Sequence, residues 1–555
     1  MGLALALDKE PELAAPTDLV SVPPLLVELA GPARDDAGYL STNPGTFLQA
    51  VHLAERFPES ATALSRLSAA ALIEGDTDLA QASATSAIRF ALTEGDEPAL
   101  ISAAQVLAIL GHTDSAADAM RQIGGTGPAR LAYAQVLAAQ RDFEAALEAV
   151  GESEDIGARA LRGWIRLEQG EYVEAIRELR GALAHGAPQV DVLTNLGYAY
   201  AALGEREKAY RSTRQALHLA PTSRVVALNL VAYQFAAGEF ASALTSLLAI
   251  RKHYPEDIML FAAVAEARLR LGDAKSALRE LRSARDRLEK LDVSVRKRAE
   301  ILANTAFMEW RLGKRSTENA VESIRKELLR CNFESLDIGR MLARLLTGIS
   351  QLSQLETLYK GLADVHPRHA LYELEAQLAF GRGEFGKALV AAKRWSREEP
   401  FDPAAAVTVT YLLSEVDGKY EESARFGEDA LKRVPSSALL RNNVAFGWAM
   451  AGKPQRAMRL LSGVSEVPYT LATRGLVKLS MGDIAGGSAD YERAASIAEK
   501  EKGAELATLI RLRRVLALLE LGYEADEDPR HLVEELNESD NPIAIVVRRQ
   551  VKQLT

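Results

Sequence analysis

Few residues in this chain have the types and spacing that chemistry requires. Its single cysteine, Cys331, has no neighbours that would complete a catalytic site, so we interpret it as an idle thiol. The run His366-Pro367-Arg368-His369, followed by Glu373, has the spacing of a possible set of metal ligands. Pro367 is already explained as the residue that stops a helix, so we predict no metal site here.

Two glycine-containing segments lack the context that phosphate binding needs. Gly313-Lys314-Arg315-Ser316 has no upstream glycine and falls in a predicted helix turn. Gly124-Gly125-Thr126-Gly127-Pro128 follows no predicted strand, so it is not a dinucleotide-binding loop. Nothing else resembles a catalytic domain, and we therefore expect no enzymatic activity and no cofactor.

The composition is that of an ordinary soluble chain. Its 555 residues are 48% hydrophobic and 26% charged, which excludes a disordered or collagen-like protein. At ~150 residues per domain, the length alone predicts about four globular domains. No window approaches ~18 uninterrupted apolar residues, and the apolar N-terminus stops at Asp8 without basic residues before it. With one cysteine, these features predict a cytoplasmic protein without a membrane partner.

The net charge of −10 is unevenly distributed. Residues 1–150 carry 8 basic and 20 acidic side chains, a net −12, whereas residues 268–330 carry 17 basic and 10 acidic side chains, a net +7. Two interpretations stay open. The charges form solvated helix faces, or an acidic arm and a basic mid-section contact different partners.

A 34-residue period organises the chain. It separates the glycines Gly170, Gly204, Gly238 and Gly272. Each glycine is followed at once by Glu or Asp, and five residues later by Ala175, Ala209, Ala243 and Ala277, respectively. We predict a tight turn with positive φ at each glycine, between two amphipathic helices. The acid is expected in the first turn of the second helix, and the alanine on the face toward the first helix.

Residues 190–223 match a known repeat motif, W-x2-L-G-x2-Y…A-x3-F…A…P. The matching residues are Leu196-Gly197, Tyr200, Ala209, Ala216 and Pro221. Leu193 and Thr213 depart from the pattern at its Trp and Phe positions. The chain therefore resembles the tetratricopeptide repeat (TPR) family.

The resemblance implies an all-α fold, a right-handed α-solenoid of stacked antiparallel helix pairs. Weaker copies of the pattern extend it over roughly residues 46–525, where Arg141 replaces the turn glycine in one unit. The predicted organisation is a Pro-rich N-terminal strap (1–45), an N-terminal array (46–290), longer degenerate repeats (291–367), a C-terminal array (368–525) and capping helices (526–555).

The resemblance also implies that the first helix of each pair lines a concave, peptide-binding groove. Asn195 and Asn229 recur one unit apart at its inner edge, followed by Asn304 and Asn443, and an asparagine can pair with the backbone of a bound peptide. Other residues predicted on this face are Trp164, Tyr198, Phe235, Phe307, Trp310, Arg270 and Arg311. Two interpretations stay open: these residues bind a partner, or they pack and pair between helices.

We expect a non-enzymatic scaffold or adaptor that binds an extended or helical segment of a partner protein along this groove. The alternative is a ligand- or peptide-sensing regulator, in which residues 1–45 occupy the groove as a displaceable ligand instead of covering the first repeat. A nucleic-acid-associated protein using residues 268–330 is a third class, which the acidic total disfavours. Self-association is compatible with each of these.

Overall fold

The computed structural model describes residues 47–536 apart from 75, 123–126, 187–188, 256, 258, 289–294, 347 and 503, together with 546–547 and 551. The predicted N-terminal strap lies outside the described residues, as does most of the closing helix expected near the C-terminus. The described residues are helical and contain no strand, which confirms the all-α prediction.

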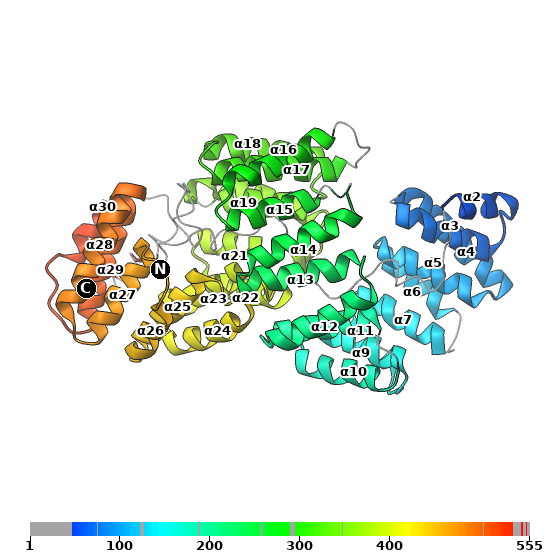
Figure 1. The fold of residues 1–555 in the computed structure, drawn as a ribbon, viewed down its shortest axis with the longest axis horizontal. Coiled ribbons are helices and arrows are strands. Elements are labelled where there is room, and N and C mark those ends of the chain that lie inside the picture. Colours follow the sequence, from blue (N-terminus) through cyan, green and yellow to red (C-terminus); the bar gives the residue numbers. More distant parts are fainter. Residues whose placement is uncertain are drawn as a thin grey trace. The chain divides into compact units, whose positions relative to one another are not determined.

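The helices follow one another in pairs joined by short turns (Figure 1). Up to residue 230 they are α2 (Phe47–Arg56), α3 (Ala61–Glu74), α4 (Thr77–Glu94), α5 (Glu97–Ile109), α6 (Thr113–Arg121), α7 (Gly127–Ala139), α8 (Phe143–Val150), α9 (Ile156–Glu168), α10 (Tyr172–Ala184), α11 (Val190–Ala202), α12 (Arg206–Leu219) and the start of α13 (Arg224–Ala237).

The later helices continue the same order. They are α14 (Phe240–His253), α15 (Met259–Arg270), α16 (Ala274–Leu288), α17 (Val295–Arg311), α18 (Thr317–Arg330), α19 (Leu336–Leu345), η3 (Ile349–Gln351), α20 (Leu352–Ala363), η4 (Arg368–Leu371), α21 (Tyr372–Gly381), α22 (Phe385–Glu398), α23 (Pro403–Tyr411), η5 (Leu412–Val416), α24 (Tyr420–Arg433), α25 (Ala438–Met450), α26 (Pro454–Leu461), α27 (Pro468–Ser480), α28 (Ile484–Lys502), α29 (Ala504–Glu520) and α30 (Pro529–Glu535).

The chain divides into two compact units, and the division falls inside α13. The N-terminal unit ends at Leu230, and the C-terminal unit begins at Val231. This boundary lies within the segment expected as a single N-terminal array. Each unit has its own packed interior, and the site described below is built from the C-terminal unit.

The predicted turns have the expected backbone. Gly204 has φ 75° between α11 and α12, and Arg141 takes φ 62° where the sequence lacks the turn glycine. The acid after the glycine lies one residue before the predicted first turn, because Glu171 and Glu205 are the N-cap residues of their helices. Neither glutamate caps with its side chain, whereas the shorter Asp273 accepts a hydrogen bond from the Ser276 N–H at 3.0 Å.

Small residues bring the two helices of a pair into close contact, as predicted. The four alanines that follow the turns, Ala175, Ala209, Ala243 and Ala277, are fully buried. On the facing helix, a Cβ added at Gly197 would overlap Thr213 Oγ1 and lie 3.4 Å from the carbonyl oxygen of Ala209. The period therefore marks the closest approach of the helices as well as the turn.

A π-helix follows α23 where the period is one residue too long. Gly383 and Gly418 are 35 residues apart instead of 34. The extra residue is absorbed in η5, a π-helix over Leu412–Val416 that brings the chain to Gly418 with φ 65°. A π-helix hydrogen-bonds residue i to residue i+5, so it holds more residues per turn than an α-helix and accommodates the extra residue. Glu415 within η5 is buried and pairs with Arg513 of α29 at 2.7 Å.

Within the C-terminal unit the chain closes on itself, because the turn between α24 and α25 contacts the end of α13. Ser436, in the turn between α24 and α25, donates through its Oγ to the carbonyl oxygen of Ala236 at 2.9 Å, 200 residues earlier. Beside this bond, the rings of Tyr233 and Phe401 pack with centroids 5.7 Å apart. These contacts join segments that no local periodicity relates, and we refer to them as the closure of the C-terminal unit.

The substitution Gly238→Ala tests this closure, because the added Cβ would lie 3.0 Å from Ser436 Cβ. Gly383 is the matched control, with a similar φ (73° against 79°) and no atom within 4 Å of an added Cβ. Both glycine-to-alanine changes carry the cost of a left-handed residue, about 1 kcal/mol. We expect Gly238→Ala to lower the free energy of unfolding by about 1 kcal/mol more than Gly383→Ala, measured by urea denaturation followed by circular dichroism. Equal losses would mean that the closure does not contribute to stability.

Candidate partner-binding surface of the first helices

The predicted groove residues lie on first helices, but nearly all are buried. In the N-terminal unit, Trp164, Asn195, Tyr198 and Asn229 are exposed by 5% or less. In the C-terminal unit, Arg270, Asn304, Phe307, Trp310 and Arg311 are exposed by 6% or less, and Phe235 is half-buried. The face that the sequence predicted as an open groove is therefore covered, and binding of a partner by these residues stays a prediction.

The predicted aromatic anchors pack against other rings of the chain. Tyr198 meets Tyr172 edge-on at 6.5 Å, and Phe307 packs against Trp310 at 5.3 Å. Phe235 packs against Phe240 across the turn between α13 and α14, at 5.7 Å. The Tyr198–Tyr172 and Phe235–Phe240 pairs stabilise contacts between neighbouring helices, whereas Phe307 and Trp310 both lie on α17. The packing interpretation therefore accounts for these aromatic residues without a bound peptide.

The two predicted cationic residues share one buried carboxylate. Arg270 Nε donates to Glu266 at 2.7 Å, and Arg311 Nη1 donates to the other carboxylate oxygen at 2.6 Å. Burial by itself would raise the pKa of Glu266, but the attraction of Arg311 and Arg270 lowers it below its usual value. The Nε and Nη2 groups of Arg311 have no hydrogen-bond partner among the described residues. These three side chains therefore contain one more cation than carboxylate, and the unsatisfied donors lie on Arg311.

This excess predicts unequal effects of two substitutions. Glu266→Gln removes the carboxylate that Arg270 and Arg311 share, and breaking a buried ion pair in this way costs about 3–5 kcal/mol. Arg311→Met removes the surplus cation and its unsatisfied donors, so we expect less than half that loss. Chemical denaturation of the full chain measures both. A larger loss for Arg311→Met would contradict the assignment of Arg311 as the surplus charge.

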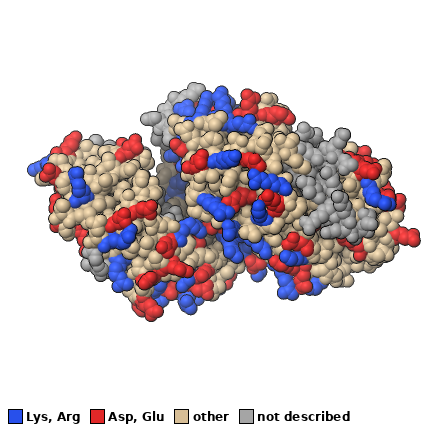
Figure 2. Space-filling view, turned by 180° about the vertical axis from the view of Figure 1, so that it is seen from behind, with Lys and Arg blue, Asp and Glu red and all other residues tan. Residues whose placement is uncertain are grey.

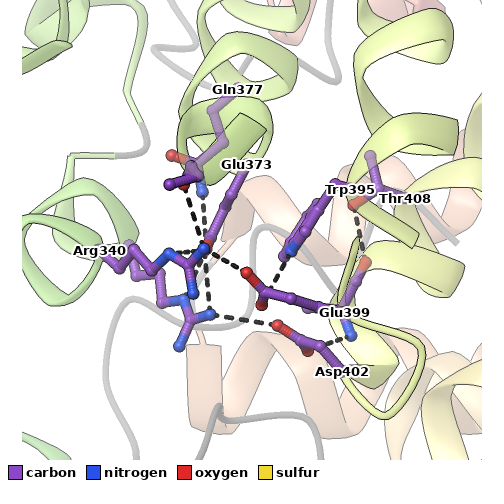
Figure 3. Close-up of polar contacts among 10 residues, drawn as sticks. Arg340, Glu373, Gln377, Trp395, Glu399, Asp402 and Thr408 are labelled. Carbon is purple, nitrogen blue, oxygen red and sulfur yellow. Dashed lines mark hydrogen bonds and ion pairs between the residues drawn. The ribbon is translucent and has the colours of Figure 1, made fainter. Parts of the chain in front are cut away.

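A second buried ion cluster joins α19, α21 and the turn before α23 (Figure 3). Arg344 Nε donates to Glu373 at 2.7 Å, and Arg344 Nη2 lies 3.5 Å from Asp402 Oδ2. Arg340 lies 3.5 Å from Glu373 and also pairs with Glu399. Two guanidinium groups thus face three carboxylates, so this cluster has one negative charge in excess, opposite in sign to the Arg311 group.

The surplus of negative charge in this cluster affects the pKa of Asp402. Burial raises the pKa of Asp402 to about 6, and the like charges of Glu399 and Glu373 add to the rise, against the attraction of Arg344. Asp402 also caps α23, where its Oδ1 accepts a hydrogen bond from the Ala404 N–H at 2.8 Å. The residue therefore combines a structural cap with a carboxylate that takes up a proton near neutral pH.

Asp402→Asn separates these two roles, because asparagine also caps helices. Since the folded state holds the Asp402 proton more tightly than the unfolded chain, the contribution of Asp402 to the free energy of unfolding falls as the pH rises from about 4 to 6. We expect Asp402→Asn to remove this decline and to raise stability at pH 7, by denaturant titration across that range.

Asp528→Asn is the control, since Asp528 caps α30 on the surface and its hydrogen bond with Arg530 lowers its pKa. This substitution is expected to give no gain at pH 7. A loss of stability at pH 7 in Asp402→Asn would contradict the interpretation that the buried charge is costly.

On four first helices, buried amide side chains have an oxygen atom that accepts no hydrogen bond from the described residues. They are Gln234 of α13, Asn304 of α17, Gln377 of α21, and the adjacent Asn442 and Asn443 of α25. Asn442 is fully buried, and neither its oxygen nor its nitrogen has a hydrogen-bond partner among the described residues. Asn443 donates to Thr410 Oγ1 at 3.0 Å but its own oxygen stays unsatisfied. Buried polar groups are normally paired, so this recurrence needs an explanation.

Several polar residues of the C-terminal unit were not predicted from the sequence. In the sequence, Glu373 stands out only through its spacing from His366 and His369, whereas in the structure it pairs with Arg340 and Arg344. The sequence does indicate that a buried carboxylate is needed, because Arg340 and Arg344 lie four residues apart in an otherwise apolar segment. His366 instead bonds the carbonyl oxygen of Phe333 through Nε2 at 2.8 Å. No group of His, Cys, Asp and Glu able to hold a metal occurs among the described residues.

The remaining motifs have structural roles. Gly313 forms a turn with φ 64°, and Ser316 caps α18. Cys331 is buried, its Sγ donates to the carbonyl oxygen of Leu328, and burial raises the pKa of its thiol. Within the described part of the chain, no helix combines the length and apolar character that crossing a bilayer requires.

Comparison with known proteins identifies the repeat that the sequence motif predicts. A family model described as "Tetratricopeptide repeat" matches residues 190–223. No curated protein is similar enough to match. A chain from the crystal structure of the APC/C hetero-tetramer Cut9–Hcn1 is 16% identical, with 92% of this chain and 91% of that chain covered and a TM-score of 0.48. A tetratricopeptide repeat protein from Parabacteroides merdae ATCC 43184 is 22% identical, with 46% of this chain and 98% of that chain covered and a TM-score of 0.31.

The matched residues are those of one helix pair, α11 and α12, with the turn at Gly204. The same arrangement of first helix, positive-φ turn and second helix recurs on both sides of it. The resemblance predicted at residues 190–223 is therefore confirmed, and helix pairs of the same arrangement continue on both sides of this repeat.

Proposed function

We propose that the chain is a non-enzymatic scaffold that binds a segment of a partner protein along the first helices of its C-terminal unit. Solenoids of stacked helix pairs present extended surfaces of this kind, and TPR folds in general support protein–protein interaction. The finer proposal, that the segment is gripped through its backbone, rests on one observation, the unsatisfied amide groups of the first helices.

A peptide backbone supplies what these amides lack. Each peptide unit carries one N–H donor and one C=O acceptor, which match the free oxygen of Asn304 and the free oxygen and nitrogen of Asn442. Leaving such groups buried and unpaired costs about 1–3 kcal/mol each. A partner that pairs them recovers this cost, whereas a purely structural role would leave it unexplained.

Access requires a change in the C-terminal unit, because the unsatisfied atoms have almost no solvent-accessible surface. The closure between Ser436 and Ala236 is the contact whose opening would widen the turn of helix pairs. We propose that partner binding and opening of this closure are coupled. The charged groups around Arg311 and Asp402, of opposite sign, would then meet complementary side chains of the bound segment.

The regulatory alternative depends on residues 1–45, which lie outside the described structure. In that case the segment would compete with a partner for the same surface, and its deletion would increase partner binding. The nucleic-acid alternative receives little support, because much of the basic section is neutralised: Arg268 pairs with Glu280 at 3.2 Å and Arg315 with Glu309 at 2.7 Å. On the face seen in Figure 2, Lys and Arg interleave with Asp and Glu instead of forming a continuous basic field.

Asn442→Leu tests the proposed function. Leucine has a similar volume and needs no partner, so we expect the variant to keep or gain stability while partner recovery falls at least about fivefold. Quantitative co-purification from the native host, with thermal unfolding of the same preparations, measures both effects.

Two further variants serve as controls. Asn443→Leu loses the bond to Thr410 and is expected to lose stability, whereas Asn319→Leu, on the exposed face of α18, is expected to leave partner recovery unchanged. Recovery of the same partners in the same amounts by wild type and Asn442→Leu would show that the amide groups do not bind them.

A further inference from the structure

A separate pocket opens between second helices of the C-terminal unit. It encloses about 610 Å³ between α20 and α22, with one face of α21 as its floor. This volume lies within the range of about 300–1,000 Å³ typical of ligand sites. The wall from α22 runs from Gly386 to Arg394, about 12 Å along the helix at 1.5 Å per residue. The shape therefore suits an elongated occupant.

The charges in this pocket are unequal. Five cations and three carboxylates line it, and each carboxylate is already paired. Glu375 accepts from Arg368 at 2.8 Å, Glu356 from Arg382 at 2.6 Å, and Glu384 lies 3.0 Å from Lys387. Two cations are left over: Lys360 on the α20 wall and Arg394 on the α22 wall, neither of which forms an ion pair with a described residue.

The floor between these two cations is apolar. Leu378 and Ala379 of α21 are buried there, and the adjoining α22 wall adds the buried Ala391 and Val390, which has 52% of its surface exposed. Gly386 leaves the wall open, since an added Cβ would have no atom within 4 Å. An apolar strip bounded by two unneutralised cations is complementary to an apolar side chain flanked by two carboxylates.

We propose that this pocket binds an acidic segment of a partner protein, with one large apolar residue on the α21 floor and acidic residues facing Lys360 and Arg394. This site is distinct from the first-helix surface and does not depend on the proposed function. Because the cations are exposed, the interaction is expected to weaken as the salt concentration rises.

A peptide selection on the full-length chain tests this proposal. A phage library of random 12-residue peptides is selected on the immobilised protein, and enriched peptides are expected to share a large apolar residue between two acidic ones. The binding of one such peptide is then measured by fluorescence anisotropy. We expect Lys360→Glu combined with Arg394→Glu to weaken it at least tenfold, and the milder Lys360→Gln with Arg394→Gln to weaken it to a smaller extent.

Arg397→Glu is the matched control, because Arg397 is an exposed arginine of the same helix that does not line the pocket. It should leave the affinity unchanged, and equal circular dichroism spectra should show that all variants fold. The proposal is overturned if no peptide of this kind is enriched, or if the double charge reversal binds the peptide as tightly as wild type. Loss of the peptide in Asn442→Leu but not in the double variant would place it on the first helices, which overturns the pocket and supports the proposed function.

Discussion

The two helices of each pair approach so closely that alanine or glycine is needed between them. The alanines at 175, 209, 243 and 277 are fully buried, and Gly197 faces Thr213 with no room for a Cβ. Contacts this close exclude water, since protein interiors pack as densely as organic crystals. A polar side chain buried on a first helix can therefore pair only with other groups of the protein, as Arg270 does, or stay unsatisfied, as Asn442 does. Much of the chemistry of the C-terminal unit follows from this constraint.

The buried ion clusters are one result. Glu266 holds two arginines, whereas Arg340 and Arg344 face three carboxylates, so neither cluster is neutral by itself. Buried ion pairs add little net stability, because desolvation offsets most of the attraction. Their geometry does restrict which first helices can lie side by side. We therefore interpret the clusters as fixing the order of the helix pairs, with the excess charges left at Arg311 and Asp402.

The sequence predicted the fold well because the repeat has local causes. A positive-φ turn and an alanine five residues later lie within one helix pair, so the 34-residue spacing contained the information. The accessible surface was harder to predict, because it depends on contacts between residues far apart, such as Ser436 and Ala236. The resemblance placed Arg270 and Arg311 in an open groove, but the pairing with Glu266 that buries them arises only in three dimensions. The pocket at Lys360 and Arg394 joins successive second helices, whose outer faces carry no sequence signal beyond being polar.

The π-helix after α23 has a consequence for how such chains change length. A one-residue insertion in an ordinary helix rotates every later side chain by about 100°, which would turn buried residues outward. Here the π-helix Leu412–Val416 takes up the extra residue before Gly418, and α24 begins two residues after this glycine, as α12 begins two residues after Gly204. The C-terminal end of a first helix is thus a place where a helical array can accommodate one additional residue, and hence its gene one additional codon, without a change in the repeats that follow.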